Sequence, residues 1–336
     1  MILHLDLPHN GYDIILERGA LGRVGELLSL DRRVLIVTDS GVPAEYAACV
    51  AAQCASPEIV TVPAGEGSKS LATMEMLLRT MLTRGFTRTD CVVAVGGGVV
   101  GDLSGFVAAS FMRGIDFYNI PTTVLSQVDS SIGGKVAVNL DHVKDVVGAF
   151  YQPKRVVIDP EVLNTLPKRQ IANGLAEAVK MSLTSDAELF SLFEAGRVET
   201  HLDQIIKRSL RVKKQVVEQD EREQGLRRIL NFGHTLGHGI EAVYADSLYH
   251  GECVALGMLP MCAPAVRERL MPVLASLGLP TEVTGDLEKI LENASHDKKC
   301  AGKDVSVVWV DRIGTCEIRK MPLEAWKEEI RVALRG

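Results

Sequence analysis

The first half of the chain repeats one pattern of apolar and polar positions. A short run rich in β-branched residues ends in a turn, and a segment with helically spaced apolar residues follows. The runs are Val34–Val37, Glu58–Val62, Val92–Val95 and Phe117–Ile120. Apolar strands that alternate with helices are typical of a parallel sheet covered on both faces. The pattern predicts a mainly parallel α/β domain, and looser alternation in residues 3–7 and 12–16 predicts an antiparallel edge pair.

This pattern ends near Val156–Asp159. Beyond it, apolar residues recur at helical spacing, and the next strand-like run is Val305–Val310. The spacing predicts an all-α second domain that ends in an amphipathic helix near Leu323–Leu334. We therefore place the two domains at residues 1–158 and 159–336.

Composition narrows the class of protein. Of the 336 residues, 46% are hydrophobic and 24% are charged, which is the ordinary globular mix. The net charge of -6 argues against nucleic acid as the partner. The seven cysteines are scattered and include no Cys-x-x-Cys pair, which predicts reduced thiols in a cytoplasm. We expect neither an export signal nor a membrane span.

A glycine-rich turn follows the third strand. The segment Gly96–Asp102 satisfies the G-x-G-x-x-G pattern, in which backbone amides and a helix N-terminus bind a pyrophosphate in a Rossmann-like sheet. The motif alone is weak, because a turn without a ligand can carry the same glycines, and here it follows the third βα unit rather than the first. Asp39 is a candidate partner for a ribose hydroxyl, and Glu66 and Lys69 could complete the pocket.

Three histidines and a carboxylate are candidates for a metal site. His234 and His238 lie four residues apart and so share one helical face, and His250 follows after a loop. Glu177 lies in an otherwise apolar helix with Lys180 on the same face, and such a carboxylate is costly to bury unless it is paired or binds metal. Spacing alone makes His238 a ligand candidate as well, although a single buried histidine is more often a core residue.

Two charged stretches lie near these motifs. Asp129 and Lys135 lie in a loop of small residues with little other charge, which favours a specific partner for both. A mixed charge run from residue 213 to 228 precedes the histidines, and Arg227 lies four residues before Asn231. A solvated surface is the ordinary explanation for such a run.

Taken in order, these segments resemble the 3-dehydroquinate synthase family of the sugar phosphate cyclases over almost the whole chain. The shared motifs are Gly-Glu-x-x-Lys at 65–69, Gly-Gly-Gly-Val-Val-Gly-Asp at 96–102, Pro-Thr-Thr at 121–123, Asp-Ser-Ser-Ile-Gly-Gly-Lys at 129–135, Gly-Ala-Phe-Tyr-Gln-Pro at 148–153, Leu-Ala-Glu at 175–177 and Gly-His-Thr-x-Gly-His at 233–238. The resemblance implies a homodimeric lyase that uses NAD and one zinc or cobalt ion. Its substrate would be a phosphorylated sugar acid, 3-deoxy-D-arabino-heptulosonate 7-phosphate, which is converted to 3-dehydroquinate and phosphate.

The resemblance also assigns roles to residues. The metal ligands would be Glu177, His234 and His250, so that His238 contacts the substrate instead. The NAD contacts would be Asp39, Glu66, Lys69, Gly98, Val99, Val100, Gly101, Asp102, Thr122, Thr123, Lys135 and Lys144. The substrate and catalytic residues would be Arg113, which reaches the partner subunit's site, with Asp129, Lys135, Lys180, Lys213, Glu223, Arg227, Asn231, His238 and one or both of Lys298 and Lys299.

One position departs from the family. Where the family usually has Lys-Asn before the Gly-Ala-Phe segment, this chain has Lys144-Asp145. The usual asparagine lies near the substrate phosphate, which a carboxylate would repel unless it is protonated or paired with a lysine such as Lys135 or Lys144.

Two alternative functions stay open. Another sugar phosphate cyclase would act on a substrate without a carboxylate; Asp145 favours it weakly, and Lys213 and Arg227 argue against it. A metal-dependent polyol dehydrogenase would carry out a net oxidation, and the phosphate-directed lysines argue against that.

Overall fold

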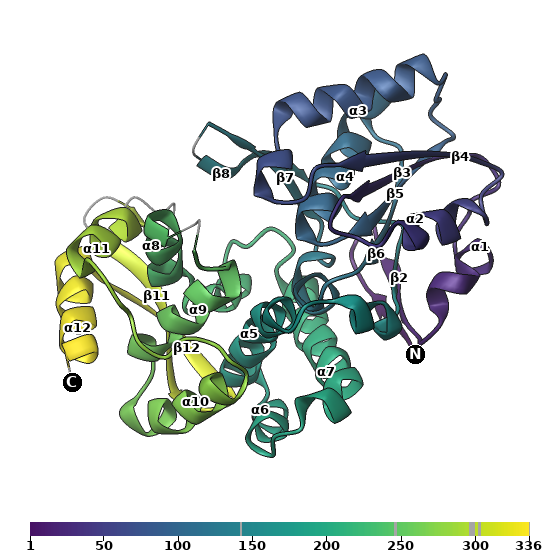
Figure 1. The fold of residues 1–336 in the computed structure, drawn as a ribbon. Coiled ribbons are helices and arrows are strands. Elements are labelled where there is room, and N and C mark those ends of the chain that lie inside the picture. The colour runs from purple at the N-terminus through teal and green to yellow at the C-terminus, as the bar shows by residue number, and fades with distance from the viewer. Residues whose placement is uncertain (142, 245–246, 296–299, 302–303, 336) are drawn as a thin grey trace. The chain divides into compact units, whose positions relative to one another are not determined.

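The computed structural model describes residues 1–141, 143–244, 247–295, 300–301 and 304–335, and the chain divides into two compact units, Met1–Pro167 and Lys168–Gly336 (Figure 1). The division falls later than the boundary expected after residue 158. Val162 packs into the core of the first unit. The carboxylate of Asp159 also accepts hydrogen bonds of 3.0 Å from the amides of Gly19 and Leu21. These contacts join the residues after 158 to the first unit.

A seven-stranded sheet forms the centre of the first unit. Its strand order is β1-β2-β9-β6-β5-β3-β4. Strands β1 and β2 pair antiparallel and the other neighbours pair in parallel, as the sequence predicts. The strands are β1 (Ile2–Leu5), β2 (Tyr12–Leu16), β3 (Arg33–Asp39), β4 (Ser56–Val62), β5 (Cys91–Gly96), β6 (Asp116–Pro121) and β9 (Arg155–Ile158).

Helices bury both faces of this sheet. Alternate residues of β3 belong to different cores, with Val34 and Ile36 in one and Leu35 and Val37 in the other. The first core includes residues of α1 and α2, and the second includes residues of α3 and α4. Burial on both sides explains why the central strands β3 and β5 are mostly apolar. The helices are α1 (Val24–Leu27), α2 (Ala44–Ala51), α3 (Leu71–Thr83) and α4 (Gly98–Ser110).

A separate antiparallel hairpin, which the sequence analysis did not predict, belongs to the first unit. It consists of β7 (Lys135–Leu140) and β8 (Val143–Phe150). The amide of Asn139 donates a 2.8 Å hydrogen bond to the carbonyl oxygen of Lys69, which ties the hairpin to the segment after β4. All of β8 is exposed apart from the partly buried Val147.

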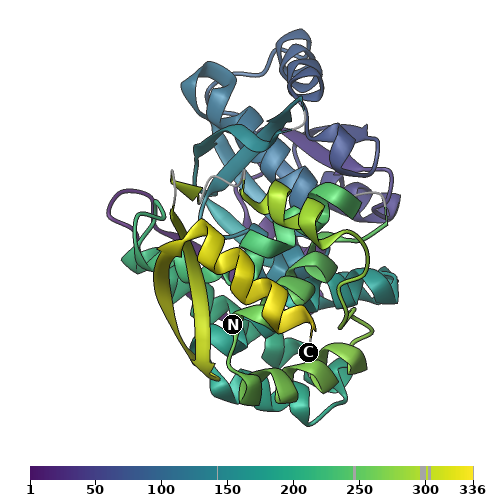
Figure 2. The same ribbon diagram turned by 90° about the vertical axis from the view of Figure 1, so that its left-hand side faces the viewer.

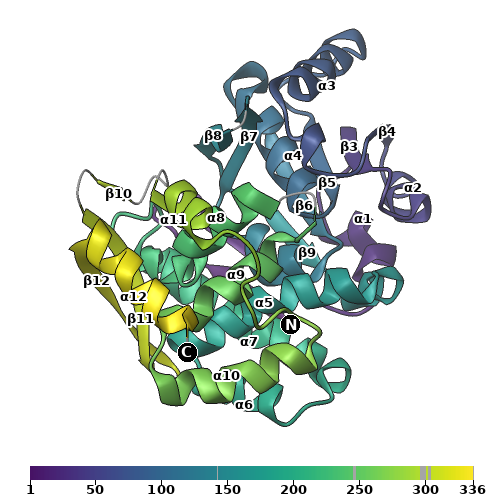
Figure 3. The same ribbon diagram turned by 60° about the vertical axis from the view of Figure 1, so that its left-hand side comes forward.

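The second unit is mainly helical, as predicted, but a three-stranded antiparallel sheet corrects the expectation of an all-α domain (Figures 2 and 3). Its strands are β10 (Cys300–Ala301), β11 (Asp304–Arg312) and β12 (Thr315–Pro322). The valine-rich β11 has a buried face, and Gly314, with φ 86°, lies in the turn that leads into β12. Helix α12 follows, as predicted, and its Trp326 is fully buried.

The helices of the second unit provide most of its mass. They are α5 (Lys168–Ser185), α6 (Ala187–Glu194), α7 (Val198–Gln219), α8 (His234–Tyr244), α9 (His250–Met258), α10 (Pro264–Ser276), α11 (Leu287–Ser295) and α12 (Leu323–Arg335). Among the described residues, no helix combines the length and the apolarity needed to cross a bilayer.

Candidate functional site

Helix α5 carries two buried charged side chains. Glu177 and Lys180 are each 1% exposed, and the ammonium of Lys180 forms an ion pair with the carboxylate of Glu177. Taking two charges out of water is costly, so such a pair is stable only where further polar groups surround it. For Glu177 these further groups come from two other helices.

His234 begins α8 and His250 begins α9, and glycines allow these two helices to pack closely. Gly233 has a φ of 77°, and a Cβ atom there would lie 2.7 Å from Cγ of Met258. A Cβ atom on Gly257 would lie 2.0 Å from the carbonyl oxygen of Gly233. A larger side chain at either position would push the helices apart, so these glycines fix the relative position of the two imidazoles.

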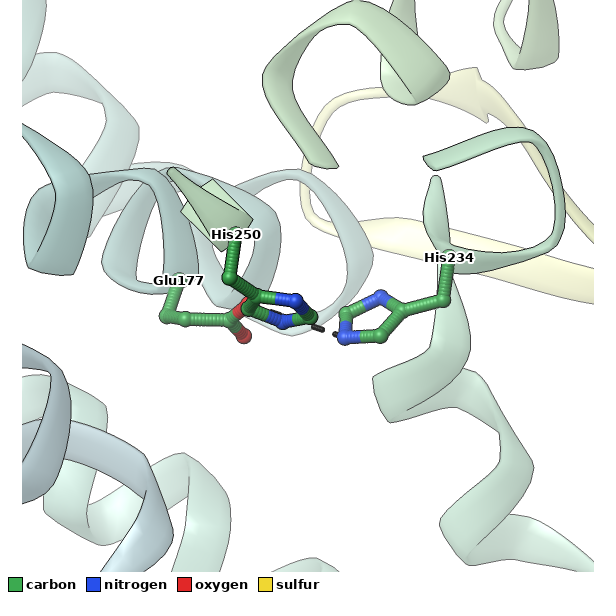
Figure 4. A group of neighbouring side chains, drawn as sticks. All are labelled: Glu177, His234 and His250. Atoms are coloured by element: carbon green, nitrogen blue, oxygen red, sulfur yellow. Dashed lines mark ion pairs between the residues drawn. The ribbon is translucent and has the colours of Figure 1, made fainter. Parts of the chain in front are cut away.

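Glu177, His234 and His250 point toward one another from α5, α8 and α9 (Figure 4). The Nε2 atoms of His234 and His250 each lie 3.6 Å from Oε1 of Glu177. Ligand atoms of the three residues all lie within 4.8 Å of one another. The structure therefore brings together the three residues that the family resemblance implies as metal ligands.

The residues present fit a divalent metal ion. Among the described residues, Oε1 of Glu177 is buried without a hydrogen-bond partner while Oε2 is in the ion pair with Lys180, so Oε1 can accept a further partner. Nδ1 of His234 lies 3.1 Å from the carbonyl oxygen of Phe232. A proton held on Nδ1 by that carbonyl leaves the lone pair of Nε2 directed at Glu177. One carboxylate and two imidazoles form a ligand set that leaves coordination positions open for a substrate.

Burial and neighbouring charges shift two pKa values in this group. Burial raises the pKa of Glu177, but Lys180 and His250 outweigh it and bring the pKa to about 2. Burial lowers the pKa of His250, but the carboxylates of Glu177 and Glu241 outweigh it and bring the pKa to about 10. Glu177 is thus ionised at neutral pH, and a metal ion at this point would replace the proton on His250.

His238 lies beside this group. Its ring centroid is 5.5 Å from that of His234 and 6.0 Å from that of His250. With Glu241 and His250 it forms a second group whose ligand atoms lie within 4.8 Å of one another. The four-residue spacing thus brings His238 next to His234 and His250. The family resemblance favours a substrate contact for it.

Two residues of α5 hold the first turn of α9 in place. Arg169 donates to both carboxylate oxygens of Glu252, at 2.7 and 2.8 Å. Four residues further along α5, Oδ1 of Asn173 accepts the amide of Gly251 at 2.6 Å. These contacts lie one and two turns before Glu177 of α5, so they fix where α9 begins. Neither Arg169 nor Asn173 was predicted from the sequence.

The other predicted substrate residues of the second unit are largely buried. Lys213 is 6% exposed and Arg227 is 2% exposed. The guanidinium of Arg227 donates to the carbonyl oxygen of Glu221, and the side-chain amide of Asn231 donates to the carboxylate of Glu223. Buried cations of this kind can bind an anionic group strongly, because little water screens them. Residues 298 and 299 lie outside the described residues.

In the first unit, the predicted nucleotide contacts gather at the carboxyl ends of parallel strands. Asp39 ends β3, Gly96 ends β5, and Thr122 directly follows β6. Helix α4 begins at Gly98 without a side-chain cap, so its first amides are available to an anion. This edge of a parallel sheet is where such folds bind ligands. The remaining predicted contacts that follow β4, β5 or β6 are Glu66, Lys69, Val99, Val100, Gly101, Asp102 and Thr123.

Lys69 contacts two carboxylates. Its Nζ lies 2.5 Å from Oδ2 of Asp102 and also forms an ion pair with Asp145. Burial raises the pKa of Asp102 to about 6, against the opposite effect of Lys69. Burial lowers the pKa of Lys69, but the carboxylates raise it above its usual value. Asp145 is thus paired with a lysine, and this lysine, Lys69, was not one of the two named from the sequence.

Four other predicted residues of the first unit lie in loops or in the hairpin. Arg113 is exposed with a φ of 69°, a strained conformation that often marks a functional constraint. Asp129 lies in the π-helical turn Ser126–Ser130. Lys135 begins β7 and Lys144 lies in β8, and both are exposed. Exposure leaves these cations accessible to an anionic ligand.

Glu241 on α8 was not predicted from the sequence. Its Oε2 lies 3.2 Å from Nδ1 of His250. Glu241 comes seven residues after His234 and three after His238, which places all three on one face of the helix. The helical spacing that identified the histidines therefore contained the signal for Glu241 as well.

Comparisons with known proteins agree on one family. The profile described as "3-dehydroquinate synthase N-terminal" matches residues 59–173, and "3-dehydroquinate synthase C-terminal" matches residues 174–300. The 3-dehydroquinate synthase of Streptococcus suis (strain 05ZYH33) is 40% identical, over 99% of this chain and 100% of the relative. That of Streptococcus gordonii is 41% identical, over 98% and 100%.

Solved structures share the fold over nearly the full length. A 2-deoxy-scyllo-inosose synthase, complexed with carbaglucose-6-phosphate, NAD+ and Co2+, has a TM-score of 0.90 at 25% identity and covers 99% of this chain and 100% of its own. The 2-epi-5-epi-valiolone synthase of Streptomyces hygroscopicus, with NAD+ and Zn2+, has a TM-score of 0.88 at 26% identity over 98% and 97%. A Schizosaccharomyces pombe glycerol dehydrogenase shares the fold alone, at a TM-score of 0.62 and 16% identity over 96% and 88%. With both family profiles matched and about two fifths of its residues identical to these synthases, the chain belongs to the 3-dehydroquinate synthase family.

Proposed function

We propose that the chain is a 3-dehydroquinate synthase, a carbon-oxygen lyase that converts 3-deoxy-D-arabino-heptulosonate 7-phosphate to 3-dehydroquinate and phosphate. The reaction would run by transient oxidation with NAD, β-elimination of phosphate, reduction and intramolecular aldol closure. The convergence of Glu177, His234 and His250 carries the proposal, since it occurs in a chain 40% identical to such synthases over nearly its full length.

The metal would be a single zinc or cobalt ion held by Glu177, His234 and His250. The solved structures that name Co2+ and Zn2+ support both choices. When bound, such an ion supplies Lewis acidity that stabilises negative charge on a substrate oxygen. Lys180 holds the carboxylate of Glu177 through its ion pair, and Phe232 orients His234 through its carbonyl oxygen.

NAD would bind at the carboxyl edge of the first unit's sheet. Its partners would be those gathered there, Asp39, Glu66, Lys69, Gly98 to Asp102, Thr122 and Thr123, together with Lys135 and Lys144 of the hairpin. These residues would hold NAD, whose nicotinamide would supply hydride transfer in both directions. Lys69 would meet an anionic or hydroxyl group of the cofactor while Asp102 holds its ammonium.

The substrate would be held by charge. Buried Lys213 and Arg227 would bind its carboxylate, and Arg113, Lys135 and His238 would bind its phosphate. The remaining proposed contacts are Asp129, Lys180, Glu223, Asn231 and one or both of Lys298 and Lys299. Two separate anionic groups on one substrate explain why the chain carries two sets of cations.

The two rival functions have less support. A cyclase for a substrate without a carboxylate would have no use for the buried pair Lys213 and Arg227. Its solved examples are only 25% and 26% identical to this chain. A polyol dehydrogenase shares the fold at 16% identity, and this likeness gives no support for a dehydrogenase reaction in this chain.

We also propose that the chain is a cytoplasmic homodimer. Edge strand β8 supports the dimer, because Val143, Val146 and Phe150 are each more than 40% exposed on it, and an unpaired edge with apolar side chains readily meets another copy. Sedimentation of the purified chain measures its mass in solution, and we expect the mass of two chains rather than one. Six described cysteines, none of them in a disulfide, support the cytoplasm.

Replacing Asp145 by asparagine should leave the KM for substrate unchanged or lower it by up to roughly fivefold, because the half-exposed carboxylate of Asp145 is screened by water and its repulsion of an anionic substrate is worth only about 1 kcal/mol. The change removes one of the carboxylates near Lys69 and keeps a residue that tolerates the φ of 53°. Asp141→Asn is the matched control, since Asp141 has a φ of 52° in the turn of the same hairpin. A large loss of activity in Asp145→Asn alone would mean that the carboxylate has a role of its own.

The proposed function is tested by phosphate release. Purified enzyme should release phosphate from 3-deoxy-D-arabino-heptulosonate 7-phosphate when NAD and zinc or cobalt are both present. Absence of phosphate release under these conditions would contradict the proposed function.

A further inference from the structure

The Nδ1 atoms of His250 and His234 face different kinds of hydrogen-bond acceptor. Each ring directs Nε2 toward Glu177, at 3.6 Å in both cases. The Nδ1 of His234 faces a neutral carbonyl oxygen. The Nδ1 of His250 lies 3.2 Å from Oε2 of Glu241, a carboxylate whose side chain is only 13% exposed.

A carboxylate at Nδ1 determines which nitrogen of His250 carries the proton. The ionised Glu241 can only accept a hydrogen bond, so Nδ1 must donate. When a metal ion replaces the proton on Nε2, that nitrogen would direct its lone pair at the ion beside Glu177. A partly buried negative charge on the far side of the ring also makes this lone pair a better electron donor.

We propose that Glu241 is a positioning residue that fixes the orientation and the Nδ1–H tautomer of His250, and thereby strengthens binding of the metal ion. This inference rests on the proposed metal site. Glu241 reaches the ion only through His250. It comes from α8, the helix that also carries His234, so α8 orients one imidazole directly and the other through this carboxylate.

A competing role follows from the same geometry. His238, Glu241 and His250 could themselves bind a second ion, because their ligand atoms lie within 4.8 Å of one another. In that case Glu241 would be a ligand. The two roles differ in the number of ions bound per chain, so a measurement of stoichiometry separates them.

The test measures the affinity of chelator-stripped protein for Co²⁺ and Zn²⁺ by competition with a chromophoric chelator. Glu241→Ala should bind about 10- to 100-fold more weakly than the unmodified chain, as is usual when such a carboxylate is lost. Glu241→Gln should lie between the two, because its amide oxygen still accepts from Nδ1. The absorption spectrum of bound Co²⁺ should change in Glu241→Ala.

Glu194→Gln is the matched control, since Glu194 is paired with Arg269 on the surface of the same unit. It should leave the affinity unchanged. Circular dichroism and the thermal midpoint of each metal-free variant show whether it is folded. If Glu241→Ala does not fold, Glu241→Gln takes its place in the comparison.

Three outcomes would overturn the inference. Unchanged affinity in folded Glu241→Ala would show that Glu241 does not position His250. Two ions per unmodified chain, with one lost in Glu241→Ala, would make Glu241 a ligand. If Glu177→Gln binds metal as tightly as the unmodified chain, the proposed metal site itself fails, and the inference fails with it.

Discussion

Replacing Glu177 by glutamine should lower the rate of phosphate release by at least about a thousandfold, because the Lewis acidity of a bound metal is worth several kcal/mol. Glutamine has the shape of glutamate without its charge. It cannot balance Lys180 or complete the ligand set with His234 and His250. Chelator treatment of the unmodified enzyme should have the same effect, and added zinc or cobalt should restore the activity. Metal content by atomic absorption and phosphate release measure both.

The fold must be controlled in this experiment. Without the carboxylate, Lys180 becomes an uncompensated buried charge, which can cost about 3–5 kcal/mol of stability. His234→Ala avoids this because the ion pair on α5 remains, and it should lose metal and activity alike. Glu194→Gln should change neither. Full activity in metal-free protein would refute the proposed metal site.

Replacing His238 by alanine should lower turnover by about a hundredfold or more, the usual scale for loss of a group that assists proton transfer or charge stabilisation. Metal content should stay near one ion per chain. His238 lies beside His234 and His250, but the site formed with Glu177 does not require it. The experiment therefore separates a substrate contact from a metal ligand.

The opposite outcome has a clear meaning. If His238→Ala loses its metal, the four-residue spacing from His234 identifies a ligand pair, and the family's assignment does not apply to this chain. If both turnover and metal content are unchanged, His238 has no direct part in the reaction.

The fold of the first unit could be predicted because both faces of its central strands are buried. Continuous apolar runs such as Val34–Val37 show this directly. The hairpin β7–β8 was missed because neither strand has a continuous buried run: β7 buries only alternate residues, Val136 and Val138, and β8 is exposed apart from the partly buried Val147. The sheet of the second unit could be predicted only in part. The run Val305–Val310 in β11 is apolar, but β12 contains the charged residues Glu317, Arg319 and Lys320 and has no apolar run.

The candidate site was predictable only as far as its residues are unusual in their own segments. His234, His238 and the buried Glu177 stand out by spacing or by charge among apolar residues. The contacts of Arg169 with Glu252 and of Lys69 with Asp145 join residues far apart in the chain, so no local pattern reveals them. Glu241 was visible in principle, because it lies on the same helical face as the two histidines.

The most direct test of the proposed function follows phosphate release and the absorbance of reduced nicotinamide in the same cuvette, with 3-deoxy-D-arabino-heptulosonate 7-phosphate as substrate. If the hydride is taken and returned within one site, NAD is needed only in catalytic amount. Phosphate should then appear continuously while no NADH accumulates. NADH formed in stoichiometric amount from a polyol, with no release of phosphate, would contradict the synthase assignment and identify the chain as a dehydrogenase.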